Sequence, residues 1–321
     1  MKHLTRILVA LMLTISFAMP SGAAEAARLR IALLPIPDVL PVYVALEQGY
    51  FKEAGIAVEP ISVGSALERD QLMQAGRIDA MINELAGTAS FNRDKALMQT
   101  VAVARAPKGD SPLFRILAAP GSDIDTPEEL AGVPIAVSMN TVIEYLTDRI
   151  LQDKGLPRER IVKQSVPVLP ERMQLLLSGQ IKAATLPDPL AFAAMKAGAR
   201  VVMDDTLAPL YSASVISFST KTIQTTPKAV DGFVKAWMRA AADLNQNPEA
   251  FRALMLKKIR VPKNVQKSFP IPPFPVAQIP TKAQWDDVMA WMIQKGLLKA
   301  PVSYEISVAP RGFTPGESKS Q

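Results

Sequence analysis

Apolar and polar positions alternate along the chain in short blocks, and these blocks predict strands and helices in turn. From residue 29, each short apolar run is followed by a stretch with the three-to-four-residue apolar spacing of a helix. The predicted strands of this first block are 29–34, 57–63, 78–82, 100–105 and 113–118, and its helices are about 41–49, 66–75 and 86–93. Strands that alternate with such helices are typical of βαβ units and parallel sheets.

A second block repeats this order. It begins with a helix that has Thr126 as N-cap and Pro127 in the first position. Its strands are predicted at 134–137, 160–166, 181–186 and 199–203, and its helices at 141–154, 171–178 and 189–197. Residues 72–80 and 175–183, which lie 103 positions apart, share the order helix, glycine stop, strand. This pattern is common enough to arise by chance, but the repeated order of elements favours two similar units.

The C-terminal third contains one more predicted strand, at 213–219, and two helices. The first helix spans about 226–244, and its apolar residues form a stripe that is typical of core packing. Five prolines within 268–280 exclude a helix there and predict an extended surface segment. The last helix is predicted at 285–297, and we expect disorder over 311–321. Three tryptophans lie on these helices and are predicted core residues: Trp237, Trp285 and Trp291.

The composition excludes several classes of chemistry. The 321 residues are 49% hydrophobic and 21% charged, which is typical of a globular protein. There is no cysteine, and the only histidine is His3, so disulfides, thiolate nucleophiles and, once the N-terminus is removed, histidine triads are excluded. The sequence also has no calcium loop, P-loop or dinucleotide fingerprint. We therefore expect no catalytic residue, no metal and no cofactor.

Residues 1–26 have the features of a secretory signal peptide. Basic residues precede an apolar run at 7–19, which is too short to span a membrane. Small residues favour cleavage after Ala24 or after Ala26. We expect a free protein in the periplasm, without a lipid anchor; the alternative is a buried N-terminal helix.

The formal net charge of +6 is interspersed along the chain, without a run of five or six like charges. A nucleic-acid binder would cluster its basic residues and place aromatic residues among them, so we expect no nucleic-acid partner. The excess of positive charge favours anionic partners only weakly.

Several segments resemble one family of proteins. Residues 48–58, QGYFKEAGIAV, are very close to the GYFKEEGLDVE-type signature of periplasmic substrate-binding proteins of the alkanesulfonate and thiamine-pyrimidine-precursor (NMT1/THI5-like) family. Further matches follow in the family's order at GRIDA (76–80), TPEELAGVPIAV (126–137), LLLSGQIKA (175–183) and LPDP (186–189). The likeness covers nearly all of residues 28–305, and it is specific for the fold and weak for the ligand.

The resemblance implies a two-lobed α/β fold of the periplasmic-binding-protein type (type II-like), in which each lobe is a mixed sheet flanked by helices. Lobe 1 would comprise residues 28–116 plus 213–310, and lobe 2 residues 117–212, with a hinge near residues 117 and 212. Such a protein closes on a small-molecule ligand and delivers it to the membrane permease of an ABC importer. We expect it to act as a monomer.

Four predicted strand ends carry candidate ligand-binding residues, because ligands of open α/β sheets sit beyond the carboxyl ends of the strands. The candidates are Pro37, Asp38 and Tyr43 after the first strand, Asn83 and Glu84 after the third, Ser138, Asn140 and Thr141 after the strand at 134–137, and Asp188 after the strand at 181–186. Family members use the same loops. Structural alternatives stay open: the aspartates and the 138–141 segment could cap helices, Tyr43 could be core, and Glu84 could lie on a surface loop.

The types of residue at these ends bear on the ligand. The carboxylates of Glu84 and Asp188 favour a cation or an N–H donor and oppose a bare anion. We expect no arginine or lysine at these ends, whereas a sulfonate or nitrate site would have serines, backbone amides or an arginine there. The residues favour a nitrogen-containing ligand that resembles a pyrimidine, an amine or a zwitterion; a binder of sulfonate-type or nitrate-type anions is the alternative.

Two other classes of function are open. One is an enzyme on this fold, but the pyrimidine synthase of the family is cytoplasmic and uses a histidine, and residues 27–321 contain none. The other is a periplasmic ligand-sensing protein, which the sequence does not separate from a transport protein.

Overall fold

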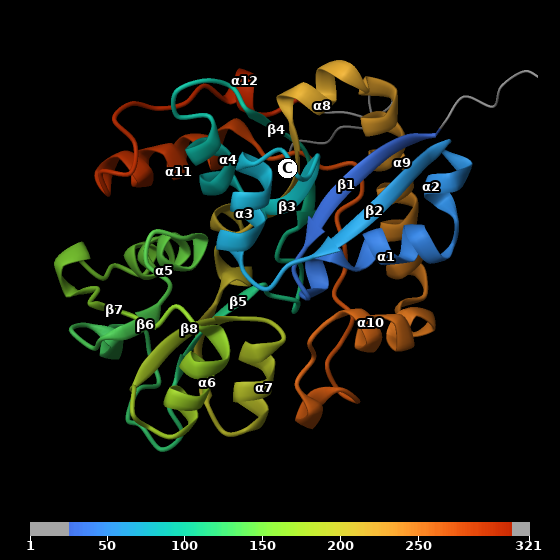
Figure 1. The fold of residues 1–321 in the computed structure, drawn as a ribbon. Helices are drawn as coiled ribbons and strands as arrows, with labels where there is room; N and C mark the ends of the chain where they lie inside the picture. Colours follow the sequence, from blue (N-terminus) through green and yellow to red (C-terminus); the bar gives the residue numbers. More distant parts are fainter. Residues whose placement is uncertain (1–25, 310–321) are drawn as a thin grey trace, which may run out of the picture.

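The protein is built around two five-stranded sheets, each flanked by helices (Figure 1). The computed structural model describes residues 26–309. The predicted signal peptide, apart from its last residue, and the predicted disordered tail 311–321 lie outside this range. Among residues 26–309, no helix is both long and apolar enough to cross a membrane. The predicted α/β class, with a mixed sheet flanked by helices in each half, is confirmed.

The first sheet has the strand order β2-β1-β3-β10-β4. Its strands are β1 (Ala27–Leu33), β2 (Ile56–Ser62), β3 (Ala80–Glu84), β4 (Met98–Arg105) and β10 (Ser214–Ser219). Its helices are α1 (Leu40–Glu47), α2 (Tyr50–Glu53), α3 (Ala66–Gln74), α4 (Leu85–Phe91), α8 (Thr220–Thr225), α9 (Pro227–Gln246) and α10 (Arg252–Lys258). β1, β2 and β3 run parallel because helices connect them, and β10 is antiparallel to both its neighbours.

The long helix α9 supplies much of the core of this half. Its predicted apolar stripe is buried, with Trp237 only 1% exposed. The Phe233 ring stacks on the Phe51 ring with centroids 5.1 Å apart and meets Phe218 of β10 edge-on at 5.3 Å. Phe51 of the GYFKEAGIAV segment is thus a packing residue, which fits a segment that indicates the fold and not the ligand.

The second sheet has the order β7-β6-β8-β5-β9. Its strands are β5 (Phe114–Ala118), β6 (Ile135–Val137), β7 (Lys163–Ser165), β8 (Ala183–Pro187) and β9 (Arg200–Asp204), and its helices are α5 (Val142–Asp153), α6 (Leu169–Leu177) and α7 (Leu190–Lys196). β6, β7 and β8 run parallel, whereas β5 is antiparallel to β8 and β9.

The two halves share one structural unit, as the 103-residue repeat predicts. α6 and β8 occupy the positions of α3 and β3 shifted by 103 residues at both ends. Each unit contains a fully buried arginine at the equivalent place, Arg69 in α3 and Arg172 in α6. Arg69 Nη1 donates to the Ile82 carbonyl (3.0 Å) and Arg172 Nη1 to the Thr185 carbonyl (2.7 Å), again 103 residues apart.

The chain passes between the sheets at residues 106–113 and again at 205–213. β5 belongs to the second sheet, so the first passage lies before residue 117, in the loop that follows β4. The buried carboxylate of Asp205 joins the two passages: it accepts hydrogen bonds from the amides of Leu113 (3.0 Å) and Phe114 (3.2 Å).

Helix α11 (Lys282–Gln294) packs on both halves (Figure 1). Trp291 Nε1 donates to Asp148 of α5 at 2.9 Å, and the Tyr145 hydroxyl donates to Asp287 at 2.7 Å. A capping box of Thr281 and Gln284 starts the helix three residues before the predicted start. Trp285 and Trp291 are buried, as expected, and residues 268–280 form no helix.

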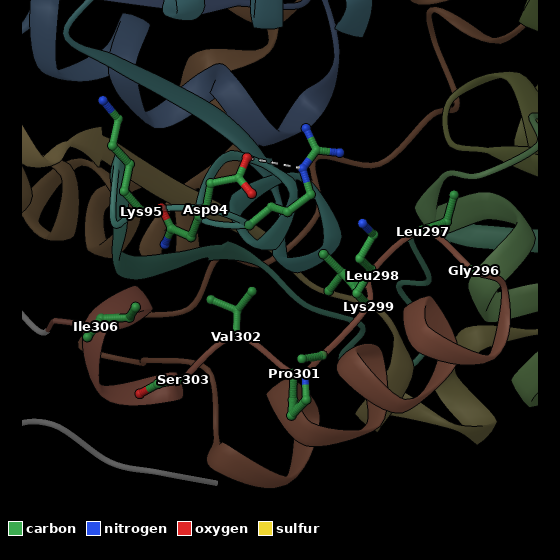
Figure 2. Close-up of a pocket in the computed structure, with 13 residues that line it drawn as sticks. Asp94, Lys95, Gly296, Leu297, Leu298, Lys299, Pro301, Val302, Ser303 and Ile306 are labelled. Carbon is green, nitrogen blue, oxygen red and sulfur yellow. Dashed lines mark ion pairs between the residues drawn. The ribbon is translucent and has the colours of Figure 1, made fainter.

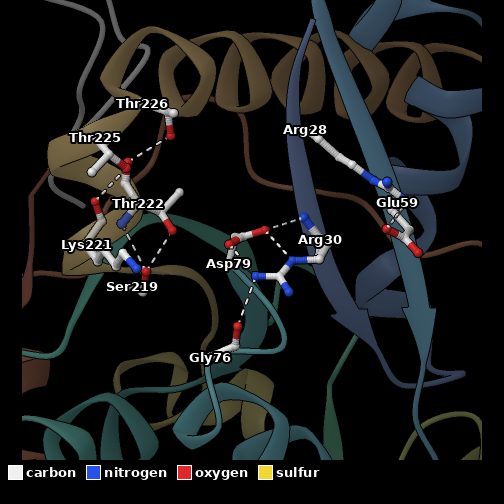
Figure 3. Close-up of polar contacts among 10 residues, drawn as sticks. All are labelled: Arg28, Arg30, Glu59, Gly76, Asp79, Ser219, Lys221, Thr222, Thr225 and Thr226. Atoms are coloured by element: carbon white, nitrogen blue, oxygen red, sulfur yellow. Dashed lines mark hydrogen bonds and ion pairs between the residues drawn. The ribbon is translucent and has the colours of Figure 1, made fainter.

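At the amino end of β3, inside the first sheet, the aspartate of the GRIDA segment ties β1 to β3 (Figure 3). Asp79 accepts from Arg30 N (2.8 Å), Nε (3.0 Å) and Nη2 (2.9 Å). The repeat diverges here, because Lys182 occupies the equivalent position. Asp79 is therefore part of the framework of the first half.

One predicted helix is mostly absent. Only the single 3-10 turn Glu128–Leu130 forms where the sequence predicts a helix over 126–132. The Glu129 carboxylate accepts from the amides of Asp125 (2.7 Å) and Thr126 (2.9 Å), which closes a compact turn in place of a Thr126 cap. The helices that the sequence analysis missed are short: α2, α8, α10 and α12 (Tyr304–Ser307).

Candidate ligand-binding cleft

The carboxyl ends of β3 and β6 face each other across a narrow gap. A small cavity of about 10 Å³ is lined by Glu84 and Leu85 from the first half, by Val142 and Tyr145 of α5, and by Tyr211 from the second passage. Both halves thus contribute to one cleft, at the place where ligands of open α/β sheets bind.

Glu84 is the candidate that faces this cleft from the first half. It is the last residue of β3, and its side chain is 32% exposed. Its Oε2 lies 3.5 Å from Arg69 Nη2, so the carboxylate has a cation behind it and solvent in front. The carboxylate can accept an N–H from a ligand, but its charge is partly balanced already.

Ser138 directly follows β6 in the second half and contacts a buried arginine. Arg172 Nη2 donates to Ser138 Oγ at 2.5 Å, and its other donors go to the Val166 and Thr185 carbonyls. Arg172 forms no ion pair with any residue in the range 26–309, in contrast to Arg69. Burial lowers the pKa of Arg172 to about 10, so it stays protonated at neutral pH.

Asn140 and Thr141 shape the loop that opens α5. Asn140 adopts the left-handed conformation (φ 61°), and its backbone N–H donates to the buried Glu144 carboxylate at 2.6 Å. Thr141 is the N-cap: its Oγ1 accepts from Ile143 N (3.1 Å) and donates to the Ser138 carbonyl (2.7 Å). The capping alternative is therefore correct for Thr141, which positions Ser138 at the positive end of the helix.

Two aspartate candidates are buried in ion pairs. Asp38 Oδ1 lies 3.2 Å from Arg105 Nη1, and Asp188 pairs with Arg115 while also accepting from Phe192 N at 3.0 Å. Burial raises the pKa of Asp188, and the positive charge of Arg115 opposes this rise. Neither side chain is more than 10% exposed.

The expectation that no arginine lies at these strand ends is wrong. Arg69, Arg105, Arg115 and Arg172 lie beside Glu84, Asp38, Asp188 and Ser138, respectively. The arginines come from other elements of the chain, so adjacency in sequence does not reveal them. The argument that free carboxylates repel anions loses its basis for Asp38 and Asp188.

The remaining candidates lie away from the cleft surface. Asn83 is 1% exposed and donates to Thr88 Oγ1 (3.1 Å), within a buried network of hydroxyls. Pro37 is buried in the 3-10 turn after β1. Tyr43 is 8% exposed, and burial raises the pKa of its hydroxyl. Lys258 Nζ lies over the Tyr43 ring, 4.8 Å from the ring centroid. These three are framework residues in this structure, and Tyr43 lines a different groove.

Sequence reasoning missed Asp205 and the four arginines. Burial raises the pKa of Asp205 to about 6, against the opposing effect of its hydrogen bonds with Ser212 and the 113–114 amides. A usable signal did exist for two arginines, because the 103-residue repeat aligns Arg69 with Arg172.

Two larger grooves lie outside the cleft. One, of about 700 Å³, is bounded by residues 92–95 and 296–303, and Figure 2 shows Asp94, Lys95 and Lys299 on its walls. The other, of about 720 Å³, lies between the ends of β1 and β2 and residues 256–266. Among residues 26–309, no cluster of acidic or histidine side chains could hold a metal ion.

Two α/β sheets that share a cleft at their strand ends define the fold of the periplasmic binding proteins. The sequence profile of the NMT1/THI5-like family matches residues 36–251, and the chain belongs to this family. A comparison with curated proteins found no match.

Solved structures with the same fold include binding proteins and an enzyme. The periplasmic aliphatic sulphonate binding protein SsuA from Escherichia coli is 19% identical, with 89% of this chain and 94% of that chain covered and a TM-score of 0.73. A ligand-binding component of an ABC-type import system from Staphylococcus aureus, with zinc bound, is 13% identical (88% and 97% covered, TM-score 0.72). The desulfurization enzyme DSZB is 18% identical (88% and 96% covered, TM-score 0.62). At these identities the likeness shows the fold alone.

Proposed function

We propose that the protein is the periplasmic solute-binding component of an ABC import system and binds a small zwitterion-like molecule in the cleft. The family and the binding-protein neighbours support the transport role. We further propose that it is not an enzyme, although the neighbour DSZB shares the fold. Its lobes would be divided at the two passages, 106–113 and 205–213, and not at residue 117 as the sequence predicted, with α11 bridging them.

The observation that carries the ligand proposal is the uncompensated charge of Arg172. A buried cation without a carboxylate partner is costly, and an anion bound in front of it would offset that cost. Ser138 accepts from Arg172 and donates a long hydrogen bond to the Pro167 carbonyl (3.4 Å), which it would exchange for such an anion, and the N-terminal end of α5 adds positive potential. An anionic group therefore fits best at the Ser138–Val142 loop.

Glu84 supports the other half of the ligand. Its carboxylate is partly exposed and lines the same narrow cavity as Val142 at the start of α5. The cavity of about 10 Å³ has room for about one water molecule, so the two halves would open to admit a ligand with a positive or N–H-bearing group at one end and an anionic group at the other. A simple sulfonate, the second candidate, needs only the Ser138 side, and it is favoured by the same arginine.

The test is isothermal titration of refolded, ligand-free protein with amino-acid-like and aminosulfonate zwitterions, alkanesulfonates, amines and pyrimidines. We expect a zwitterion to bind, and S138A to weaken it about 10- to 100-fold, because a hydrogen bond to a charged group is lost. Ser178, exposed at the far end of α6, provides the matched control S178A, which should bind normally.

Glu84→Gln separates the two ligand classes. It should weaken a zwitterion or amine and leave a simple sulfonate unchanged or tighter. A zwitterion that binds to S138A with full affinity would overturn the anion subsite. Binding of alkanesulfonates in preference to every zwitterion would keep the transport role and replace the ligand class.

A further inference from the structure

The positive charge of the protein comes from one segment, residues 250–285. This segment holds seven of the 36 basic residues and none of the 30 acidic residues, so the rest of the chain has 29 basic residues against 30 acidic ones. No run of like charges reveals it, because apolar and polar residues separate the cations. The impression of evenly interspersed charge is therefore wrong for this part of the chain.

Five cations of the segment form what we call the basic face: Lys257, Lys258, Arg260, Lys263 and Lys267. All five are exposed, and none forms an ion pair with any residue in the range 26–309. The backbone beneath them is fixed, since Arg260 N donates to the Pro35 carbonyl at 3.0 Å. The charges are thus displayed on a defined surface and are not neutralised within the protein.

The segment that carries the basic face extends from the first half to the second. Four of its members line the groove of about 720 Å³ beside the ends of β1 and β2. Further along, Asn264 Nδ2 donates to the Ala193 carbonyl of α7 at 3.4 Å, and the Phe192 and Phe269 rings meet edge-on at 5.5 Å. In Figure 1 the orange segment below α10 descends towards α7 in this way.

The chemistry of the basic face favours a diffuse anionic partner. Unpaired like charges repel one another, and a surface of opposite sign relieves that repulsion. Four of the five cations are lysines, whose ammonium groups act as mobile point charges, whereas specific recognition of protein carboxylates favours the planar fork of arginine. A plane of phosphate head groups matches mobile point charges, and its attraction grows with each added cation.

We propose that the basic face binds reversibly to an anionic phospholipid surface, so that α10 and the segment after it face the membrane. Such contact would hold the protein near the plane in which a permease lies and would confine its search for that permease to two dimensions. The role of this membrane contact in import rests on the proposed function, whereas the binding of the basic face to lipid does not depend on it.

The experiment is co-sedimentation of the protein with vesicles of phosphatidylcholine alone or with about 30% phosphatidylglycerol. We expect binding only to the anionic vesicles, and loss of binding in high salt, where screening is strong. Each cation near the surface contributes about fivefold, so the triple variant K257Q/K258Q/K263Q should bind about a hundredfold more weakly. The matched control K52Q/K182Q/K299Q removes three exposed lysines elsewhere and should bind like the wild type.

Three results would overturn the proposal. They are equal weakening by both triple variants, absence of wild-type binding to anionic vesicles at low salt, and binding to native membrane vesicles but not to vesicles of their extracted lipids. The last result would point to an acidic membrane protein. Thermal melting of each variant checks that it is folded, and ligand titration of the same variants tests the transport proposal separately.

Discussion

The buried carboxyl of Asp205 makes the stability of the protein depend on pH in a way that one substitution can isolate. Its pKa is raised from 3.8 to about 6 by burial. Below pH 3.8 the group is protonated in both the folded and the unfolded state, and it adds no penalty. Between pH 3.8 and about 6 the unfolded state ionises while the carboxyl, which is 0% exposed in the folded state, keeps its proton, so stability is lost over this range; above about pH 6 both states are ionised and the loss is complete.

The size of this loss follows from the shift in pKa. A rise from 3.8 to about 6 corresponds to about 3 kcal/mol of unfolding free energy at high pH. About 2 kcal/mol of this loss of unfolding free energy falls between about pH 4.5 and about pH 7.5. The remainder is lost below about pH 4.5, because the carboxyl of the unfolded state already ionises there. Asparagine at position 205 does not titrate, so D205N should lack this part of the pH dependence.

Urea unfolding, followed by the fluorescence of the buried tryptophans, measures the effect at several pH values. The unfolding free energy of the wild type minus that of D205N should fall by about 2 kcal/mol between about pH 4.5 and about pH 7.5. Taking this difference cancels the titration of all other groups. D110N, on an exposed turn, controls for loss of one negative charge. A difference that stays constant with pH, or that grows as the pH rises, would refute the reasoning.

Three further predictions concern the framework, and each can be measured by urea or thermal unfolding. D79A should cost about 2 kcal/mol, because three hydrogen bonds from Arg30 are lost, whereas E59A, in an exposed pair with Arg28, should cost less than about 1 kcal/mol; equal losses would contradict this. F233A should cost about 3–5 kcal/mol because it empties a buried aromatic contact, and a loss below about 1 kcal/mol would show that the core refills the space. Y145F keeps the ring and removes the 2.7 Å hydrogen bond to Asp287, so it should cost about 1 kcal/mol; no change in the melting temperature would mean that this contact between α5 and α11 adds nothing.

The elements with strong periodic patterns were predictable from the sequence. The apolar stripe of the helix predicted over 226–244 identifies α9, and the repeat at 72–80 and 175–183 identifies the shared unit of α3 with β3 and of α6 with β8. These patterns depend on the spacing of apolar residues along the chain, which can be read directly from the sequence. Where a local signal had a competitor, prediction failed: at 126–132 the Glu129 carboxylate closes a turn that the Thr126 and Pro127 pattern does not reveal.

The location of the cleft also followed from sequence, because strand ends can be placed once the strands are known. Glu84 lines it, whereas Asn83 points into a buried network one residue away. Side chains on a strand alternate between faces, so a one-residue uncertainty at a strand end changes which candidate reaches the ligand.

By itself the sequence determined the α/β class, the internal repeat, the family and the strand ends that carry polar residues, because each of these rests on local spacing or on a contiguous motif. Only the tertiary structure decided the electrostatics of the cleft. Arg69, Arg105, Arg115 and Arg172 reach the strand ends from distant or separate elements, and they neutralise some carboxylates and leave one cation unpaired. Charge interactions act through space over a few ångströms, so their balance depends on which segments the fold brings together and not on their order in the chain.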